Sequence, residues 1–424
     1  MRSFLCGICK LFGGMLYAQT VQGIVLDSVT QQPITSANVY FSNTAMGTTT
    51  NAGGSFLLNM LPPGKYDLIV SFVGYELYHV PVPPEQRITN LRILLKPRVA
   101  ELKEVVLRQS EKFGWEKWGS LFMEHVVGTS LFAEETELLN NDALRFYFDK
   151  TTNKVTATAN KRLLIRNKAL GYDIKFDLGQ FAFDTLTKDF AYEGFPFFEE
   201  MKTGRESVRK RWEKNRETAY HGSLMHFYRC LYDGRLAGSG FEVRRWGFLT
   251  MEEKKRVKKL YTEYLDFKKS SQNAIGPNPY NYIDNTDSIG YFRKVMDNAG
   301  DSPMLLDTLL KADSLVYRRG NASVGFRFPG SLQVLFRHRD FPVEYGRSYP
   351  DMINRIKPAL VKPSPVTTNI YMKGTTPITV YINGAYLDGE SLYTDGYWSW
   401  AEKLSGIVPY DYFPKANNNQ EVAK

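Results

Sequence analysis

The sequence predicts an α+β multidomain protein, in which an N-terminal all-β sandwich precedes a mixed α+β domain with an antiparallel sheet. Short stretches with an apolar residue at every second position, separated by turn residues, occupy residues 21–95. Apolar stripes at helical spacing and further alternating stretches share the remainder of the chain. The 424 residues are enough for two or three domains, and 43% hydrophobic residues is the composition of a globular protein.

The sandwich is predicted from alternation and from turn chemistry. Val21, Gly23 and Val25 share one face of the first strand, and the Asn-Ala-Gly-Gly sequence at Asn51–Gly54 predicts a turn. Pro62–Lys65 predicts another turn, because proline fixes φ and glycine permits positive φ. About seven short strands at this spacing are typical of a sandwich. The predicted strands are 21–26, 37–41, 47–51, 55–59, 66–72, 79–82 and 91–95.

Five motifs in this region resemble the carboxypeptidase-regulatory-like domain, a transthyretin/Ig-like β-sandwich, over roughly a fifth of the chain. In Bacteroidetes such domains stand at the front of exported proteins, TonB-dependent receptors among them, and Glu101–Leu107 resembles the segment that follows them there. The resemblance implies a docking or spacer module and no catalysis. The motifs lie at Val21–Asp27, Pro33–Val39, Gly47–Phe56, Pro63–Tyr66 and Val70–Tyr75.

Residues 1–18 have the pattern of an export signal. Arg2 supplies a positive charge, Phe4–Leu16 is mostly apolar, and Ala18 is a small residue suited to cleavage before Gln19. Lys10 and Leu16 depart from this pattern, which leaves a mis-assigned start as the alternative. We expect an exported protein, periplasmic or associated with the outer membrane. Cleavage would remove Cys6 and Cys9 and leave Cys230 as the one cysteine, so no intramolecular disulfide is expected.

The predicted division is a signal peptide at 1–18, the sandwich at 19–96, a linker at 97–112, a mixed α+β domain at 113–416 and a tail at 417–424. The mature chain has no predicted transmembrane helix. Within the mixed domain, helices are predicted at 113–127, 207–216, 223–231, 252–267 and 397–401. Strands are predicted at 104–107, 144–148, 155–158, 163–165, 172–178, 181–183, 190–192, 241–244, 315–317, 323–328, 332–336, 369–372 and 378–382. Residues 271–287 and 358–365 are predicted to be loop and linker.

Four stretches of the mixed domain resemble an uncharacterised Bacteroidetes family that carries the same front domain. This resemblance implies membership and no mechanism. The stretches are Leu164–Tyr172, Lys210–Arg216, Tyr220–Phe227 and Gly396–Trp400.

The residues that catalysis would need are not found in a recognisable pattern. A zinc carboxypeptidase uses a His-x-x-Glu pair, but the residues three positions after the five histidines are Val82, Gly128, Leu224, Arg229 and Phe341. His-Glu-x-x-His, a Gly-x-Ser-x-Gly elbow, a P-loop and a dinucleotide motif are also missing. A Ser223–His226 pair can be drawn, but we favour a helix start with Ser223 as its cap. We therefore predict no catalytic residue, cofactor or metal site.

Two segments are candidates for a binding surface. Residues 202–216 hold seven basic residues against two acidic ones, which suits an anionic partner, although a solvated helix face is the simpler interpretation. Aromatic residues near the C-terminus could form a platform for a sugar or peptide, but burial against the sheet is favoured for at least half of them. They are Tyr386, Tyr393, Tyr397, Trp398 and Trp400. Nearby carboxylates at Asp388, Glu390 and Asp395 could bind calcium, but an exposed acidic turn is favoured. The predicted surface residues are Arg209, Lys210, Arg211, Tyr393, Tyr397, Trp398 and Trp400.

The leading functional hypothesis is a non-enzymatic cell-envelope protein, with the sandwich as docking module and the second region as an interaction domain. Its expected partners are an envelope protein or glycan and peripherally the membrane surface, with nucleic acid excluded by the export signal. The alternatives are an envelope hydrolase with an unrecognised site and an accessory to TonB-dependent uptake.

Overall fold

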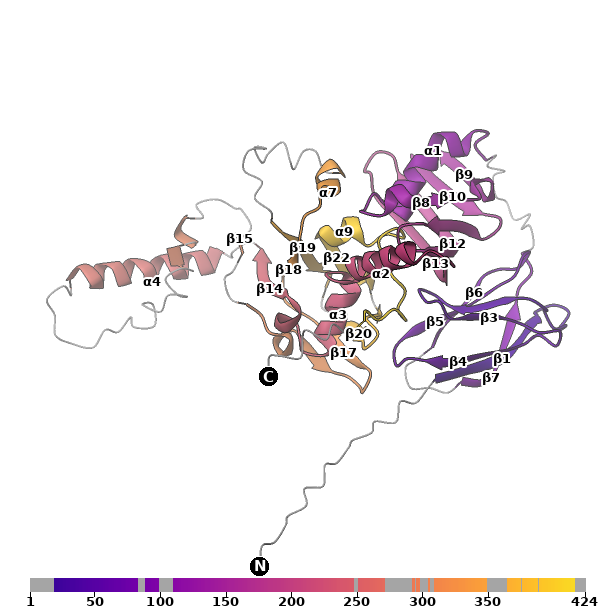
Figure 1. Ribbon diagram of the computed structural model, residues 1–424. Coiled ribbons are helices and arrows are strands. Elements are labelled where there is room, and N and C mark those ends of the chain that lie inside the picture. The colour runs from indigo at the N-terminus through magenta and orange to yellow at the C-terminus, as the bar shows by residue number, and fades with distance from the viewer. Residues whose placement is uncertain are drawn as a thin grey trace, which may run out of the picture. The chain divides into compact units, whose positions relative to one another are not determined.

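The computed structural model describes residues 19–82, 88–98, 110–247, 251–270, 292–293, 295–297, 304–305, 309–348, 364–374, 376–387 and 389–415 (Figure 1). The chain divides into two compact units: Met1–Phe41 with Met46–Val99, and Ser42–Ala45 with Ala100–Lys424. The predicted signal peptide, the strand at 104–107, the loop at 271–287, Asp388 and the tail lie outside the described residues, as does most of 358–365.

The first unit is a sandwich of two sheets, which confirms the predicted fold (Figure 1). One sheet has the order β4-β1-β7 and the other the order β3-β2-β5-β6. β1 pairs antiparallel with β4 and parallel with β7. The inward residues Val25, Val39 and Leu68 are inaccessible to solvent, as alternation predicts. The strands are β1 (Gln19–Asp27), β2 (Asn38–Phe41), β3 (Gly47–Thr49), β4 (Ser55–Leu61), β5 (Tyr66–Ser71), β6 (Tyr78–Val82) and β7 (Ile88–Leu95).

The predicted turn at Asn51–Gly54 is present and has a clear cause. The Asn51 side-chain oxygen accepts hydrogen bonds from the Gly53 and Ser55 backbone N–H groups, both at 3.0 Å. Gly54 has φ of 73°, and a Cβ there would lie 2.5 Å from the Val25 carbonyl oxygen. Glycine is therefore required at this position.

The second unit begins with an antiparallel sheet of order β8-β11-β12-β10-β9, with β13 paired to β12. The predicted helix at 113–127 is present as α1 (Gly114–Phe122) followed by a π-helical turn, Met123–Val127. Phe122 of α1 packs on the sheet against Phe146 and Phe181. The strands are β8 (Thr136–Leu138), β9 (Leu144–Asp149), β10 (Lys154–Ala159), β11 (Leu163–Asn167), β12 (Tyr172–Asp184) and β13 (Phe190–Glu200).

Two predictions in this region need correction. Residues 172–178 and 181–183 form one strand, because a register shift between Leu178 and Gln180 interrupts the alternation without ending the pairing to β13. The basic helix predicted to end at Arg216 is α2 (Glu206–Tyr220) and runs one turn further. Its buried face includes Trp212, Ala219 and Tyr220, an apolar stripe that the dense basic residues obscure in the sequence.

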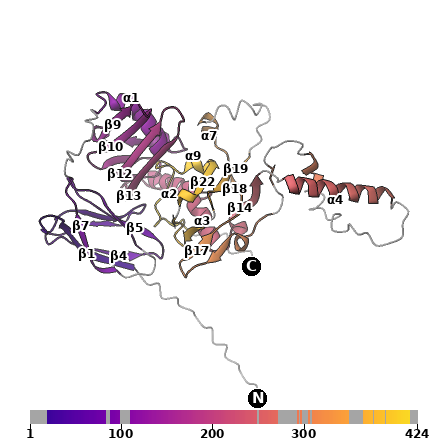
Figure 2. The ribbon, with the colours of Figure 1, turned by 180° about the vertical axis from the view of Figure 1, so that it is seen from behind.

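The remainder of the second unit packs two further antiparallel sheets around α3 (Leu224–Tyr232) (Figure 2). Their orders are β15-β14-β18-β19-β22 and β16-β17-β20-β21. Phe227 of α3 contacts Phe241 in the sheet that contains β14 and Phe326 in the sheet that contains β17. The strands are β14 (Phe241–Gly247), β15 (Met304–Leu305), β16 (Val316–Arg318), β17 (Ser323–Phe326), β18 (Ser331–Asp340), β19 (Pro365–Met372), β20 (Ile378–Tyr381), β21 (Tyr386–Leu387) and β22 (Leu392–Gly396).

Further α-helices of the second unit are α4 (Met251–Ser270), α7 (Val343–Ser348) and α9 (Tyr397–Ala401). α4 and α9 confirm two predicted helices. None of the helices in the described ranges combines the length and apolar character that a membrane span requires.

Candidate functional site

A cavity of about 1050 Å³ lies in the second unit where α2 passes into α3. We call it the corner cleft. Its walls include the last turns of α2, one side of α3, the end of β18 and residues 413–414 of the C-terminal segment. This volume is at the upper end of the range for small-molecule sites. The charged, titratable and aromatic side chains of its lining include Lys214, Glu217, His221, His226, Arg229, Cys230, Asp233, Arg235, His338, Arg339 and Phe413.

The turn between the two helices is rigidly built. Gly222 has φ of 83°, and a Cβ there would meet the Phe336 ring at 2.6 Å. Its backbone N–H donates to Nδ1 of His226 at 3.1 Å. The Ser223 hydroxyl accepts the His226 backbone N–H at 3.0 Å and so caps α3, which confirms the predicted role of Ser223.

His226 is a neutral core histidine. Burial, with smaller contributions from His221, Arg229 and other cations, lowers its pKa to about 3. Because Nδ1 accepts the Gly222 N–H, the neutral ring carries its proton on Nε2. The ring packs edge to face on His221 and lies near Tyr220.

The groups that could act as nucleophiles are not activated. The Ser223 hydroxyl is bonded to the His226 backbone and not to its imidazole, so the Ser–His pair drawn from the sequence is not assembled. Cys230 is buried, and burial raises the pKa of its thiol. A reactive cysteine needs a lowered pKa. Within the described residues, no group of three or more His, Cys, Asp or Glu side chains is placed to hold a metal ion.

The lining of the corner cleft contains more cations than carboxylates. The cations are Lys214, Arg229, Arg235 and Arg339, and the carboxylates are Glu217 and Asp233. Arg235 is paired with Asp233. Arg229 and Arg339 are held by neutral oxygens.

Arg229 is 6% exposed and fastens the C-terminal segment. Its guanidinium donates to the carbonyl oxygens of Asn383, Tyr410 and Tyr412 at 3.0, 2.9 and 2.9 Å. The Phe413 ring lies over it at 4.5 Å. This cation–π contact and the carbonyl bonds orient the group without cancelling its charge.

Arg339, at the end of β18, is similarly oriented. It donates to the Tyr397 hydroxyl at 2.8 Å and to the Thr218 carbonyl. It therefore ties β18 to α9 and α2 while facing both the corner cleft and a smaller cavity of about 10 Å³. That smaller cavity has room for about one water molecule.

Glu402 lines the small cavity. Burial raises its pKa to about 7, against the opposing effects of the Leu224 N–H and of Arg339. The Leu224 N–H donates to its carboxylate at 2.8 Å, at the start of α3. Its role is therefore that of a helix-start acceptor beside the cleft.

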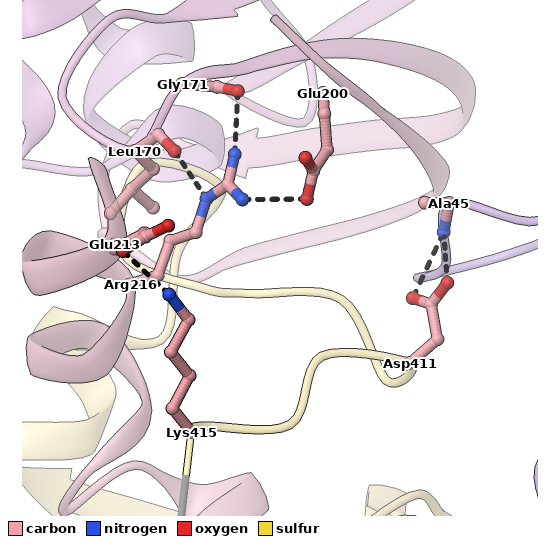
Figure 3. Close-up of polar contacts among 8 residues, drawn as sticks. All are labelled: Ala45, Leu170, Gly171, Glu200, Glu213, Arg216, Asp411 and Lys415. Carbon is pink, nitrogen blue, oxygen red and sulfur yellow. Dashed lines mark hydrogen bonds and ion pairs between the residues drawn. The ribbon is translucent and has the colours of Figure 1, made fainter. Parts of the chain in front are cut away.

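A second cavity, about 360 Å³ in volume, shares Glu217 and Phe413 with the corner cleft. Figure 3 shows its central residue, Arg216, donating to the Leu170 and Gly171 carbonyls at 2.7 and 3.0 Å and to Glu200 at 2.7 Å. Its guanidinium also lies 4.0 Å from the Tyr172 ring centroid. Arg216 thus holds α2 to the ends of β12 and β13.

The C-terminal segment is anchored on this side as well. The Asp411 carboxylate accepts the Ala45 backbone N–H at 3.1 Å, and Lys415 pairs with Glu213 at 3.0 Å (Figure 3). Burial raises the pKa of Asp411. Together with Arg229, these contacts fix residues 410–415 as the wall between the two cavities.

The predicted surface residues lie in two different settings. Arg209, Lys210 and Arg211 are exposed, and each has an ion-pair partner, Glu206 for the first two and Glu135 for the third. They remain candidates for a basic surface, which the structure does not test.

Three of the four aromatic residues predicted for the binding surface are buried, which is the outcome favoured for at least half of the aromatic cluster. Tyr397, Trp398 and Trp400 are at most 4% exposed and belong to the core around α3. The Trp398 indole N–H donates to the Gly222 carbonyl at 2.8 Å. Tyr393, 47% exposed, is the one ring that reaches solvent. Burial against the sheet and α3 removes the other three from any ligand.

The sequence interpretation missed Arg229, His338 and Arg339. Arg229 carries a detectable signal, because a charged residue in the apolar stripe Leu-Met-His-Phe-Tyr-Arg-Cys-Leu is costly to bury without a purpose. His338 and Arg339 give no such signal, since polar residues are ordinary at the end of a strand such as β18.

Comparison with known proteins identifies the first part of the chain. The family model of the CarboxypepD_reg-like domain matches residues 21–107. No curated protein matches.

Three solved structures are similar to parts of the chain. A C-terminal interface mutant of a type II cohesin-X-dockerin complex from Acetivibrio cellulolyticus has 20% identity and a TM-score of 0.16, covering 18% of this chain and 56% of that one. A protein from Bacteroides uniformis, described as a candidate carbohydrate binding protein, has 12% identity and a TM-score of 0.16, covering 37% and 57%. The Bacillus anthracis TIE protein has 11% identity and a TM-score of 0.16, covering 44% and 32%.

The chain thus spans little more than half the length of the first two structures. TM-scores of this size carry no argument about fold or function. The family match does carry one, for the front of the chain. Residues 21–107 are a CarboxypepD_reg-like domain.

Proposed function

We propose that this chain is a non-enzymatic binding protein of the cell envelope. The CarboxypepD_reg-like domain acts as its docking module, and the second unit binds a ligand in the corner cleft. The carrying observation is the cleft itself: a cavity of about 1050 Å³ with fixed hydrogen-bond donors and without an activated nucleophile among the described residues.

The state of the side chains favours binding over catalysis. A general base or nucleophile should have a pKa near the working pH and lie within hydrogen-bond reach of its partner. His226 is neutral and packed among rings, and the Cys230 thiol has a raised pKa. Arg229 and Arg339, in contrast, are held in place by several hydrogen bonds. Glu402, with a pKa of about 7, meets the pKa criterion, but its carboxylate accepts the Leu224 N–H and lines the cavity of about 10 Å³, which has room for about one water molecule. The corner cleft thus offers oriented donors without a reactive partner in its described lining, as a binding site requires.

The cellular part of the proposal is based on the sequence. The pattern of residues 1–18 supports export to the periplasm or the outer membrane. The regulatory-like domain supports a docking role. The expected partner is an envelope protein or glycan, and a Bacteroidetes origin belongs to the same proposal.

The test is to purify the tagged protein from gently solubilised native envelopes and identify by mass spectrometry what accompanies it. A stoichiometric envelope protein or a bound glycan supports the proposal, and a barrel receptor as partner points to the accessory role in TonB-dependent uptake. Recovery from the cytosol with residues 1–18 intact contradicts the export part. Turnover of a co-purified substrate by the pure protein contradicts the non-enzymatic part.

A further inference from the structure

The corner cleft contains positive charge that the described side chains do not neutralise. Lys214, on the exposed side of α2, has no carboxylate within ion-pair distance among the described residues. Arg339 is bonded to a hydroxyl and a carbonyl oxygen, and Arg229 to carbonyl oxygens alone. Within the described part of the chain, Arg235 has a carboxylate at ion-pair distance, that of Asp233. Arg339 and Arg229 interact with the charges of Glu402 and Asp411 at longer range. The net formal charge of the lining is therefore positive.

Burying cations without a counter-charge destabilises the folded protein unless a bound anion compensates their charge. Removing a cation from water without a counter-charge is among the largest penalties in a folded protein. Arg229 is 6% exposed, so it loses most of its hydration. Burial lowers the pKa of His221, Glu217 opposes this effect, and Arg339 adds to it. With four cations against two carboxylates in its lining, the cleft has an excess of positive charge that an anion would relieve.

The donors have the form that carboxylates prefer. Three of the four cations are arginines, whose planar guanidinium binds a carboxylate at two points. Arg339 uses two of its N–H donors within the protein, which leaves donors for a ligand. The rigid attachment of Arg229 and Arg339 lowers the entropy lost on binding.

The cleft also has an apolar face beside these cations. Phe413 is 56% exposed, lies over the Arg229 guanidinium and belongs to the cleft wall. A ring of this kind can contact the apolar face of a sugar while the arginines bind its charged groups. The cavity, at about 1050 Å³, is larger than a single small anion needs.

We propose that the ligand of the corner cleft is an acidic saccharide, a short sugar oligomer that carries carboxylate groups. This inference rests on the proposed binding function of the second unit and names its ligand class. Lys214, Arg235 and Arg339 bind the carboxylates, and Phe413 contacts the sugar ring.

The experiment uses two probes on the same sugar frame: the trimer of galacturonic acid and neutral galactotriose. Isothermal titration calorimetry of the full mature protein compares the two. We expect the acidic trimer to bind about tenfold tighter or more, and the difference to shrink when salt rises from about 50 mM to about 500 mM. Inorganic phosphate, a third probe, distinguishes saccharide recognition from simple anion binding and should compete only weakly.

The variants are chosen on exposed positions so that folding is unlikely to interfere. Lys214→Gln and Arg235→Gln should each weaken the acidic trimer by about three- to tenfold and leave the neutral trimer unchanged. Lys258→Gln removes the same charge from an exposed position of α4, outside the cleft lining, and should have no effect. Phe413→Ala should weaken both trimers.

The outcomes separate this inference from the proposed function. Equal binding of the two trimers, or unchanged binding in a Lys214→Gln/Arg235→Gln double variant, overturns the acidic class while the binding function stands. Phosphate that displaces the trimer completely at equal concentration overturns the saccharide part. No binding of either trimer also overturns the inference, and the envelope co-purification then decides the function by itself. Cleavage of the acidic trimer contradicts the non-enzymatic function.

Discussion

Replacing Glu402 by glutamine should change how the stability of the second unit depends on pH. The variant keeps an oxygen that can accept the Leu224 N–H at the start of α3 and removes the charge. In the native protein, burial raises the pKa of Glu402 from 4.5 to about 7. The folded state therefore holds a proton between these pH values that the unfolded state has released.

The sign follows from that proton. Because the folded state binds more protons between pH 4.5 and 7, native stability is fully present below this window and is lost as pH rises through it. Each pKa unit corresponds to about 1.4 kcal/mol, so the whole shift amounts to at most about 3 kcal/mol, less where solvent reaches the carboxyl. Glu402→Gln should match the native protein near pH 5 and be more stable by up to about 3 kcal/mol near pH 9.

Tryptophan fluorescence during urea unfolding measures this difference, because all six tryptophans lie in the second unit. The free energy of unfolding is determined for both proteins at several pH values between about 5 and 9. A stability difference that stays constant with pH, or that favours the native protein at high pH, would refute the assignment of a raised pKa to Glu402.

Three further predictions concern the cavity walls. Because burial lowers the pKa of His226 from 6.5 to about 3, the free energy of unfolding should fall as pH decreases below 6.5, by about 3 kcal/mol at pH 4. His226→Gln should remove this decrease from the pH profile measured by urea unfolding. Gly222→Ala should cost about 2 kcal/mol through its positive φ and the Phe336 clash, and an unchanged unfolding midpoint would contradict this. Arg216→Met should lower the free energy of unfolding by about 3 kcal/mol, because two backbone carbonyls lose their hydrogen-bond donor. Arg209→Met, on the exposed face of the same helix, should change it by no more than about 0.5 kcal/mol. Both values are measured from the fluorescence transition in urea.

The front domain could be predicted from the sequence because its signals are local. Alternation at Val21–Val25 and the turn at Asn51–Gly54 depend on neighbours within a few residues, and both appear in the structure as predicted. Ser223 as the cap of α3 was predictable for the same reason, since a cap hydrogen bond spans three residues.

The aromatic platform failed because spacing does not say which side of an element is covered. Tyr397, Trp398 and Trp400 look like a surface cluster in the sequence, and burial against α3 and two sheets makes them core. Tyr393, a few residues earlier on a strand, remains exposed.

The sequence by itself determined the class of fold, the seven-stranded front domain and the absence of familiar catalytic motifs. The existence of the corner cleft and the set of side chains that line it depend on the tertiary structure. Arg229 meets the carbonyl of Tyr412, and Arg339 meets that of Thr218, across more than a hundred residues of chain. Such contacts depend on how sheets and helices pack, because burial and hydrogen bonding act between surfaces that the chain order does not make neighbours.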